Sequence, residues 1–155
     1  MSFELRDHTA DVGVAATGET LEDVFVALAD GLAGASCEEF PDGGERFEVT
    51  ISAESREALL FEFLDELIYL RDVRLEFPVD TEVQITNEDG RGDEEDDDLE
   101  SEDDTENGDE WVLEGTARGV PLSEIAAREI KAVTYSEMRL ERGSEGWEAY
   151  VVFDV

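Results

Sequence analysis

The sequence has few of the side chains that most often carry out chemistry at neutral pH. Its 155 residues include one cysteine, Cys37, and one histidine, His8. A single cysteine excludes an internal disulfide bond and a cysteine-based zinc site, and we interpret Cys37 as a small residue at the end of a helix. The sequence also lacks a glycine-rich phosphate loop, a cluster of Cys and His ligands and a nucleophile-elbow serine. General acid–base catalysis therefore has few candidate groups.

Long apolar runs are also absent. No stretch approaches the roughly 20 apolar residues that a helix needs to cross a bilayer. The first residues, Met1–Arg6, lack the apolar segment of a signal peptide. We therefore expect a cytoplasmic protein that makes no contact with a membrane.

Lysine is scarce, whereas acidic residues are abundant. Lys131 is the only lysine, and 44 Asp and Glu residues against 11 Lys and Arg residues give a net charge of −33. The segment 87–110 holds 15 acids and one base, so the rest of the chain keeps 44 − 15 = 29 acids and 11 − 1 = 10 bases, a charge of −19. The acidic excess therefore covers the whole surface and is not confined to one segment.

A surface of this charge limits where the protein can fold and what it can bind. Self-repulsion opposes compaction where the Debye length is about 10 Å and is almost removed where molar salt shortens it to about 3 Å. The composition is typical of a protein from a halophilic archaeon, although an acidic protein that docks on a basic partner is a compatible alternative. Because phosphate neutralisation supplies most of the affinity for nucleic acid, we expect no direct binding of RNA or DNA.

The apolar pattern predicts two main helices. Thr20 is a suitable N-cap with Asp23 as its return partner, apolar residues follow at helical spacing, and Gly34 stands where a C-terminal glycine is expected. Ser55 is the expected cap of a second helix, whose apolar stripe begins at Leu59. Burial of these two stripes on a common sheet should be the largest favourable term in folding.

Alternating apolar residues predict about seven strands. The segment 3–17 is expected to form two short strands broken around Thr9–Asp11, and Pro78 is expected to mark a bulge or an edge strand. Later strands are expected at 47–51, 75–85, 111–115, 130–140 and 147–153, with a hairpin loop at 143–146. The fold class is therefore α+β: a two-layer domain spanning 1–155, in which two main helices pack on one face of a largely antiparallel mixed sheet.

The acidic segment 87–110 is a low-complexity insert. It has few apolar groups to offset the cost of ordering, so we expect it to be disordered and to project from a hairpin between Ile85 and Trp111. A calcium-binding loop is the alternative. The run Asp93–Asp98 lacks the ligand spacing of such a loop, which favours disorder.

Oxygen atoms are the remaining candidates for a functional site. Asp11 stands near the lone His8, and the chain closes on Asp154 and Val155 after a strand pattern. We expect the two ends to meet in space, where these residues would supply hard oxygen ligands of the kind that Ca²⁺ and Mg²⁺ prefer. Calcium takes about 6–8 oxygens, so water or a partner would have to complete the shell. A turn aspartate and a solvent-facing chain end are the structural alternative.

Five motifs occur in an order that resembles the archease family. They are HTADVG from His8, TLEDVF from Thr20, LLFEFLDELIYL from Leu59, EIKAVTY from Glu129 and the closing WEAYVVFDV. The match runs the length of the chain outside the acidic insert. The resemblance implies a non-catalytic activator of the GTP-dependent tRNA-splicing RNA ligase, which promotes guanylylation of the ligase and its turnover in tRNA splicing. It also implies a bound divalent ion, typically calcium.

Carried over by position, the resemblance implies that Asp11, Asp154 and Val155 bind the ion. His8, Lys131 and Tyr135 are candidates for contact with the partner or for support of the site. For each of these three an ordinary structural role is the alternative, namely a hydrogen-bonded histidine, a snorkelling lysine and a packed tyrosine.

Two other functions remain open at this stage. One is chaperone-like modulation of a tRNA methyltransferase, and the other is metal-dependent hydrolysis of a phosphoester by the same carboxylates. The chain also departs from the family, which commonly continues KAVTY with histidine where this sequence has Ser136. Serine is no proton carrier near neutral pH, so a histidine function at that position is in doubt here.

Overall fold

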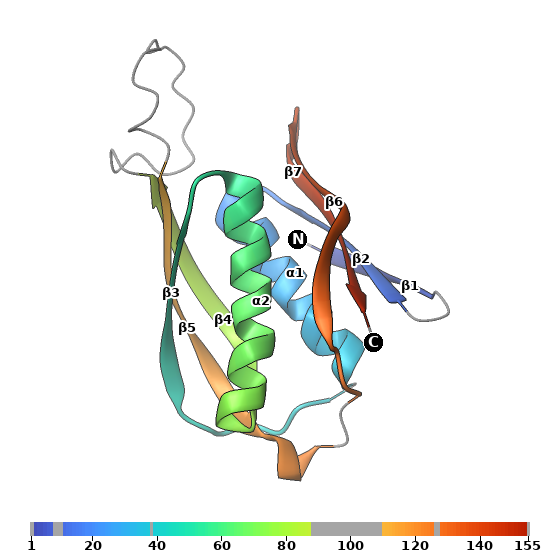
Figure 1. Cartoon of the computed structure of the whole chain (residues 1–155), viewed down its shortest axis with the longest axis vertical. Coiled ribbons are helices and arrows are strands. Elements are labelled where there is room, and N and C mark those ends of the chain that lie inside the picture. Colours follow the sequence, from blue (N-terminus) through green and yellow to red (C-terminus); the bar gives the residue numbers. More distant parts are fainter. Residues whose placement is uncertain (1, 8–10, 38, 88–109, 126–127, 155) are drawn as a thin grey trace.

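The computed structural model describes residues 2–7, 11–37, 39–87, 110–125 and 128–154, and for Asp11 it describes the backbone (Figure 1). Strands and helices follow one another without regular alternation. In chain order they are β1 (Ser2–Asp7), β2 (Asp11–Gly18), α1 (Leu21–Ser36), β3 (Arg46–Ala53), α2 (Arg56–Arg74), β4 (Glu76–Asn87), β5 (Trp111–Pro121), the 3₁₀ turn η2 (Leu122–Glu124), β6 (Ala132–Gly143) and β7 (Gly146–Asp154).

The predicted α+β class is confirmed, but the strands form two sheets where one mixed sheet was expected. One sheet has the order β1-β2-β7-β6 and the other β3-β5-β4, and all pairings among the described strands are antiparallel. The chain leaves the first sheet after β2 and returns to it with the β6–β7 hairpin. The three strands between these visits pair with one another, which makes a second sheet.

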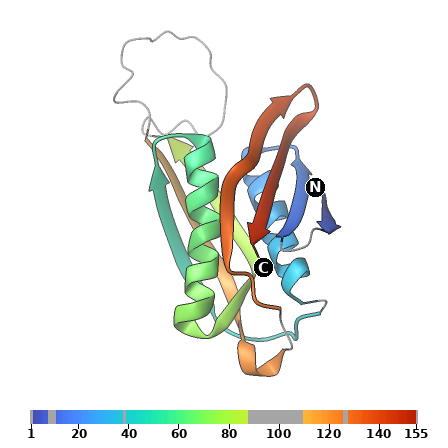
Figure 2. The ribbon, with the colours of Figure 1, turned by 45° about the vertical axis from the view of Figure 1, so that its right-hand side comes forward.

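The two helices lie between the sheets and contact both of them (Figures 1 and 2). α1 packs on β1, β2 and β7 of one sheet and on β4 of the other, while α2 packs on β3, β4 and β5 and on β6. α1 is accordingly buried on more than one stripe, because Ala27, Ala29 and Ala33 are buried along with its larger apolar residues. A helix that is apolar on most sides is expected in such an enclosed position.

Both predicted helix starts are confirmed. The Thr20 side chain accepts a hydrogen bond from the Asp23 N–H at 3.0 Å, and the Ser55 side chain accepts one from the Ala58 N–H at 3.1 Å. These bonds satisfy N–H groups that have no partner within the first turn of a helix. Cys37 ends α1, as predicted, with its N–H donating to the Ala33 carbonyl at 2.9 Å.

The predicted end of α1 at Gly34 is wrong, because the helix continues to Ser36. Gly34 faces the ring of Phe3 on β1, and one turn earlier Gly31 faces Phe3 and the side chain of Val14 on β2. A side chain on Gly31 would collide with Val14. These glycines therefore permit close packing of the helix on the sheet, and neither of them ends the helix.

The predicted hairpin around the insert is also confirmed. Asn87 at the end of β4 pairs with Trp111 at the start of β5, so the acidic segment joins two neighbouring strand ends. Residues 88–109, for which we predict disorder, lie outside the described residues.

Pro78 lies on β4, an edge strand, and the pairing register with β5 shifts shortly after it, between Val79 and Glu82.

The β4 bulge is held by arginines. Asp80 has a positive φ of 51°, and its carboxylate accepts hydrogen bonds from the Arg118 guanidinium at 2.7 Å. Arg46 donates to the backbone carbonyl of Asp80 at 2.6 Å. An aspartate tolerates this left-handed conformation better than most residues do. The bulge is thus tied to β3 and β5 by charged hydrogen bonds.

Another arginine, Arg56, contacts both sheets. The guanidinium of Arg56, at the start of α2, lies 4.8 Å from the ring centroid of Trp111 on β5 and 5.3 Å from that of Trp147 on β7. Cation–π contacts at such distances are attractive. The two tryptophans fit core positions, as the sequence indicates, but their shared arginine is visible only in the structure.

Asp30 on α1 makes stability depend on pH. Burial, with a further contribution from Asp80, raises the pKa of the Asp30 carboxyl above its ordinary value. A raised pKa means that the folded state binds the proton more tightly than the unfolded state, so this group lowers the unfolding free energy as pH rises to neutral. We therefore expect Asp30→Asn to raise the melting temperature at pH 7 and to change it little near the acidic end of the titration.

Thermal melts of both proteins between acidic and neutral pH, at fixed molar salt, would test this. Asp42→Asn is a suitable control, because Asp42 lies in an exposed turn and the substitution removes the same charge. Equal melting shifts for the two variants at pH 7 would contradict the role assigned to Asp30.

Candidate functional site

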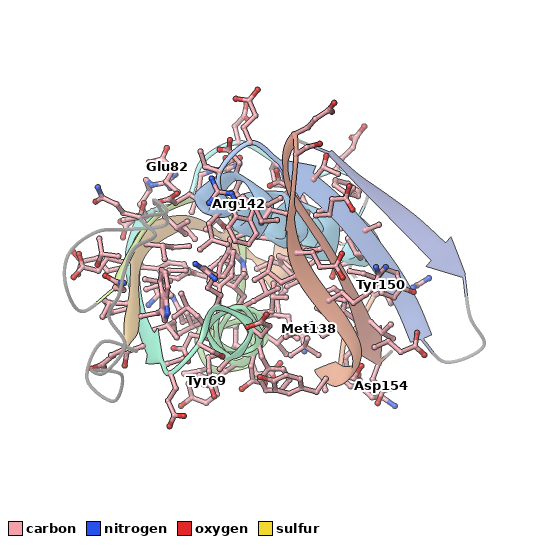
Figure 3. The ribbon with its side chains drawn as sticks, turned by 90° about the horizontal axis from the view of Figure 1, so that it is seen from above. Tyr69, Glu82, Met138, Arg142, Tyr150 and Asp154 are labelled. Atoms are coloured by element: carbon pink, nitrogen blue, oxygen red, sulfur yellow. The ribbon has the colours of Figure 1, made fainter. Side chains whose placement is uncertain are left out.

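The two ends of the chain meet in the four-stranded sheet. β2 and β7 are antiparallel neighbours, and their ladder runs from the pair Asp11–Asp154 to the pair Gly18–Trp147. Asp11 of the HTADVG motif is therefore the direct cross-strand partner of Asp154. Figure 3 shows Asp154 at the margin of the molecule, at one end of this sheet.

A third strand reaches the same place. β7 lies between β2 and β6, and Asp154 is paired on its other side with Ala132. The N–H of Lys131 donates to the Asp154 carbonyl oxygen at 2.7 Å. The backbones of Asp11, Asp154 and Lys131 thus converge at one end of the sheet, and the Lys131 side chain is exposed.

The strand alternation places Asp154 on the outer face of the sheet. Val151 and Phe153 are fully buried against the helices, and successive side chains of a strand point to opposite faces. The Asp154 carboxylate is half-buried and makes no hydrogen bond or ion pair within the described part of the chain. No described residue therefore competes with a ligand for this carboxylate.

Gly13 and Tyr150 shape the same outer face. The hydroxyl end of Tyr150 on β7 lies over Gly13 on β2, where a β-carbon would collide with it. The guanidinium of Arg139 on β6 lies 5.5 Å from the Tyr150 ring centroid. The glycine of the HTADVG motif is therefore explained by the space that Tyr150 needs. Nothing in the sequence marks Tyr150 as a site residue, because its partner lies on another strand.

The residues present fit a hard cation. Like charges directly opposite each other on neighbouring strands are destabilising, and the pair Asp11–Asp154 brings two acidic residues into that arrangement. A bound cation would relieve this cost, and carboxylate oxygen is the ligand type that Ca²⁺ and Mg²⁺ prefer. Among the described side chains, no group of three or more His, Cys, Asp or Glu gathers to hold a metal. This part of the chain therefore offers only part of a coordination shell.

The other predicted site residues are placed as follows. His8 and Val155 lie outside the described residues. Tyr135 on β6 is exposed and stacks on Phe61 of α2, with ring centroids 4.6 Å apart, so it packs on the helix and not beside Asp154. For Ser136 the structure describes only the backbone. The ligand roles of Asp11, Asp154 and Val155 stay predictions.

One cavity of about 370 Å³ adjoins the same sheet but lies elsewhere on it. It is lined by Thr17–Glu19 of the β2–α1 junction and by the β6–β7 turn from Gly143 to Glu148. Gly18 and Trp147 form the ladder pair farthest from Asp11 and Asp154. The cavity is therefore separate from the acidic pair. No helix among the described residues is long and apolar enough to cross a membrane.

Comparisons with known proteins agree on one family. The model of the archease protein family matches residues 3–155. Protein archease of Pyrococcus furiosus is 30% identical over 99% of this chain and 98% of its own length. The solution structure of protein 1598 of Methanobacterium thermoautotrophicum is 29% identical with a TM-score of 0.72, covering 99% of this chain and 98% of that one. The crystal structure of a Thermotoga maritima archease, described as a possible chaperone, has a TM-score of 0.62 at 22% identity, covers 98% of this chain and 96% of that one, and supports the fold alone.

Proposed function

Because this chain belongs to the archease family, we propose that it is a non-catalytic activator of the GTP-dependent tRNA-splicing RNA ligase. It promotes guanylylation of the ligase and its turnover in tRNA splicing, in the cytoplasm. The observation that supports the proposal is the cross-strand pairing of Asp11 and Asp154, which brings two acidic residues together at one end of the four-stranded sheet.

In this proposal the role of the chain's own residues is to bind the ion and to position it. Asp154 offers a carboxylate that has no partner among the described residues, Asp11 is its cross-strand partner, and Val155 is the next residue of the chain. The Lys131 N–H holds the Asp154 backbone at 2.7 Å and so fixes the end of β7 against β6. A bound Ca²⁺ or Mg²⁺ would supply positive charge to stabilise nucleotide phosphates. Because calcium takes about 6–8 oxygens, water or the ligase with its nucleotide would have to complete the shell of a bound ion.

Three of the described arginines are engaged within the protein, in agreement with the expectation that it does not bind RNA itself, whereas Arg128, Arg139 and Arg142 are exposed. Arg56 is held between two tryptophans, Arg118 is bonded to Asp80, and Arg71 is buried and paired with Asp72. Side chains engaged in this way are not available to neutralise phosphates, which supply most nucleic-acid affinity. The effect on tRNA splicing therefore passes through the ligase.

Single-turnover guanylylation of the cognate ligase by GTP, at molar salt and with calcium present, tests this proposal. We expect Asp11→Ala and Asp154→Ala to reduce the stimulation at least about tenfold, since even supporting groups around a metal contribute about 10–100-fold. Glu148→Ala is the matched control, because Glu148 is an exposed acid on the same strand and the substitution removes the same charge. Calorimetric titration with calcium should show weakened binding for the two aspartate variants alone.

The outcomes separate the competing functions. Full stimulation by both aspartate variants would refute the ion site. Turnover of a nucleotide or phosphoester by the purified protein alone would instead identify a metal-dependent hydrolase. Capture of a tRNA methyltransferase in place of the ligase would favour the chaperone-like modulator.

A further inference from the structure

Large apolar side chains are exposed on and around α2. Tyr69 and Val73 are 57% and 58% exposed and lie one helical turn apart, on the side of α2 away from its buried stripe. Leu75, which caps the helix, is 64% exposed. Tyr135 on β6 is 51% exposed, and its ring stacks on Phe61 of the same helix. These five residues are called the α2 strip below.

Leu75 has a conformation that the fold by itself does not favour. Its φ of 60° and ψ of 34° are left-handed, a region where glycine is normally preferred at the end of a helix. Its backbone makes the expected capping bond, from its N–H to the Arg71 carbonyl at 2.9 Å. Glycine could make that bond without strain. The exposed leucine side chain is therefore not required for the cap.

Tyr135 reaches the strip through an irregularity in its strand. The pairing register of β6 with β7 shifts between Thr134 and Arg139, and Tyr135 lies in that interval. Its ring stacks on Phe61 at an interplanar angle of 16°. The bulge therefore places an aromatic ring on the helix surface, where half of it remains exposed.

The strip faces the same side of the molecule as the acidic pair. In the view from above, Tyr69 and Asp154 both lie toward one margin of the molecule, with Met138 of β6 further inside (Figure 3).

Acidic residues surround the apolar side chains. Glu62, Asp65 and Asp72 are exposed on α2 beside the strip, and burial together with the charges of Asp65 and Glu62 raises the pKa of Glu66. The nearby cations are engaged, since Arg71 pairs with Asp72 and Arg74 lies over the Phe47 ring and beside Glu76. A second copy of this chain would bring like charges together, a cost that screening at molar salt reduces but does not turn into an attraction. A face with an apolar centre and a basic rim is complementary.

We infer that the α2 strip is the docking surface for the ligase, which meets it with an apolar centre ringed by arginine or lysine. This inference rests on the proposed function, because it takes the ligase as the partner. On this inference the α2 strip supplies the affinity for the ligase, and the Asp11–Asp154 end supplies the stimulation of guanylylation.

The test measures stimulation of the cognate ligase against the concentration of the full-length protein, at molar salt. A Tyr69→Ser/Val73→Ser double variant and the single variant Leu75→Gly are expected to raise the half-maximal concentration, about tenfold or more for the double variant, while maximal stimulation is retained. Leu75→Gly removes an exposed side chain and relieves backbone strain, so a weaker interaction cannot be ascribed to unfolding. Asp154→Ala should show the opposite pattern, a lowered maximum at an unchanged half-maximal concentration.

Each outcome has a distinct meaning. If the wild-type protein stimulates the ligase and both strip variants do so at the same half-maximal concentration, this inference is overturned. The proposed function then still stands. Absence of any wild-type binding or stimulation would overturn both. If the wild-type protein sediments as a dimer and the strip variants sediment as monomers, the strip is a self-association surface. The ligase is then not its occupant.

Discussion

Below about 0.5 M salt this protein is expected to loosen or unfold, because the screening that permits its compaction fades as the Debye length grows from about 3 Å at 1 M to about 30 Å at 0.01 M. The net charge of −33 is spread over the whole chain, and local clusters such as Glu62, Asp65 and Glu66 repel most strongly at low salt. The described ion pairs, such as Arg118–Asp80 and Arg74–Glu76, are too few to balance this excess. The expected effect is loss of the cooperative fold.

Circular dichroism and thermal melts in KCl from 0.05 M to 2 M (roughly the range over which the Debye length passes through 10 Å) would measure this. Sucrose at matched osmolality is the control, because it strengthens burial without screening charge. Calcium at millimolar concentration in low salt is a second control, with Asp154→Ala beside wild type. Rescue by calcium in wild type alone would assign the salt effect to the ion site. A cooperative fold that is unchanged at 0.05 M would refute the high-salt interpretation.

Phe63→Ala is expected to destabilise the protein by about 3–5 kcal/mol, which is a large part of the stability of a typical domain. Phe63 on α2 is fully buried and stacks on Phe25 of α1, with ring centroids 5.7 Å apart. The two helices lie between the sheets, so this contact is central to the single described core. Truncation leaves a cavity that neighbours on two helices and two sheets cannot readily fill.

Tyr69→Ala is the matched control for Phe63→Ala, because both residues are aromatic and belong to the same helix. Tyr69 is 57% exposed, so its truncation should change stability by no more than about 0.5 kcal/mol. Urea unfolding at fixed molar salt gives both values. Equal destabilisation by the two substitutions would show that the core is not organised around the Phe25–Phe63 contact.

Much of the secondary structure could be predicted because its signals are local. Thr20 and Ser55 cap the helices that they were expected to cap, since a cap depends on an N–H group three residues further along the chain. The hairpins at 85–111 and 143–146 were predicted from strand patterns that end at turn-forming or acidic segments. These features depend on little beyond their own neighbourhood.

The errors and omissions concern contacts between distant residues. Gly34 resembles a helix end in sequence, but Phe3 on β1 makes it a packing position within the helix. The division of the strands into two sheets, and the placing of Arg56 between Trp111 and Trp147, follow from how the elements pack. Gly13 is explained only by Tyr150 on a neighbouring strand.

The sequence by itself determined the acidic surface, the main helices and strands, and the motifs of the family, because composition and short-range periodicity are properties of the chain alone. From the motifs at the two chain ends it also predicted that Asp11 and Asp154 meet in space, which the strand pairing confirms, but it could not give their register. Only the tertiary structure decided that they are cross-strand partners, with Lys131 hydrogen-bonded to the Asp154 backbone. Strand register is set by which faces are buried against the helices, and that choice exists only once the sheets and helices have packed.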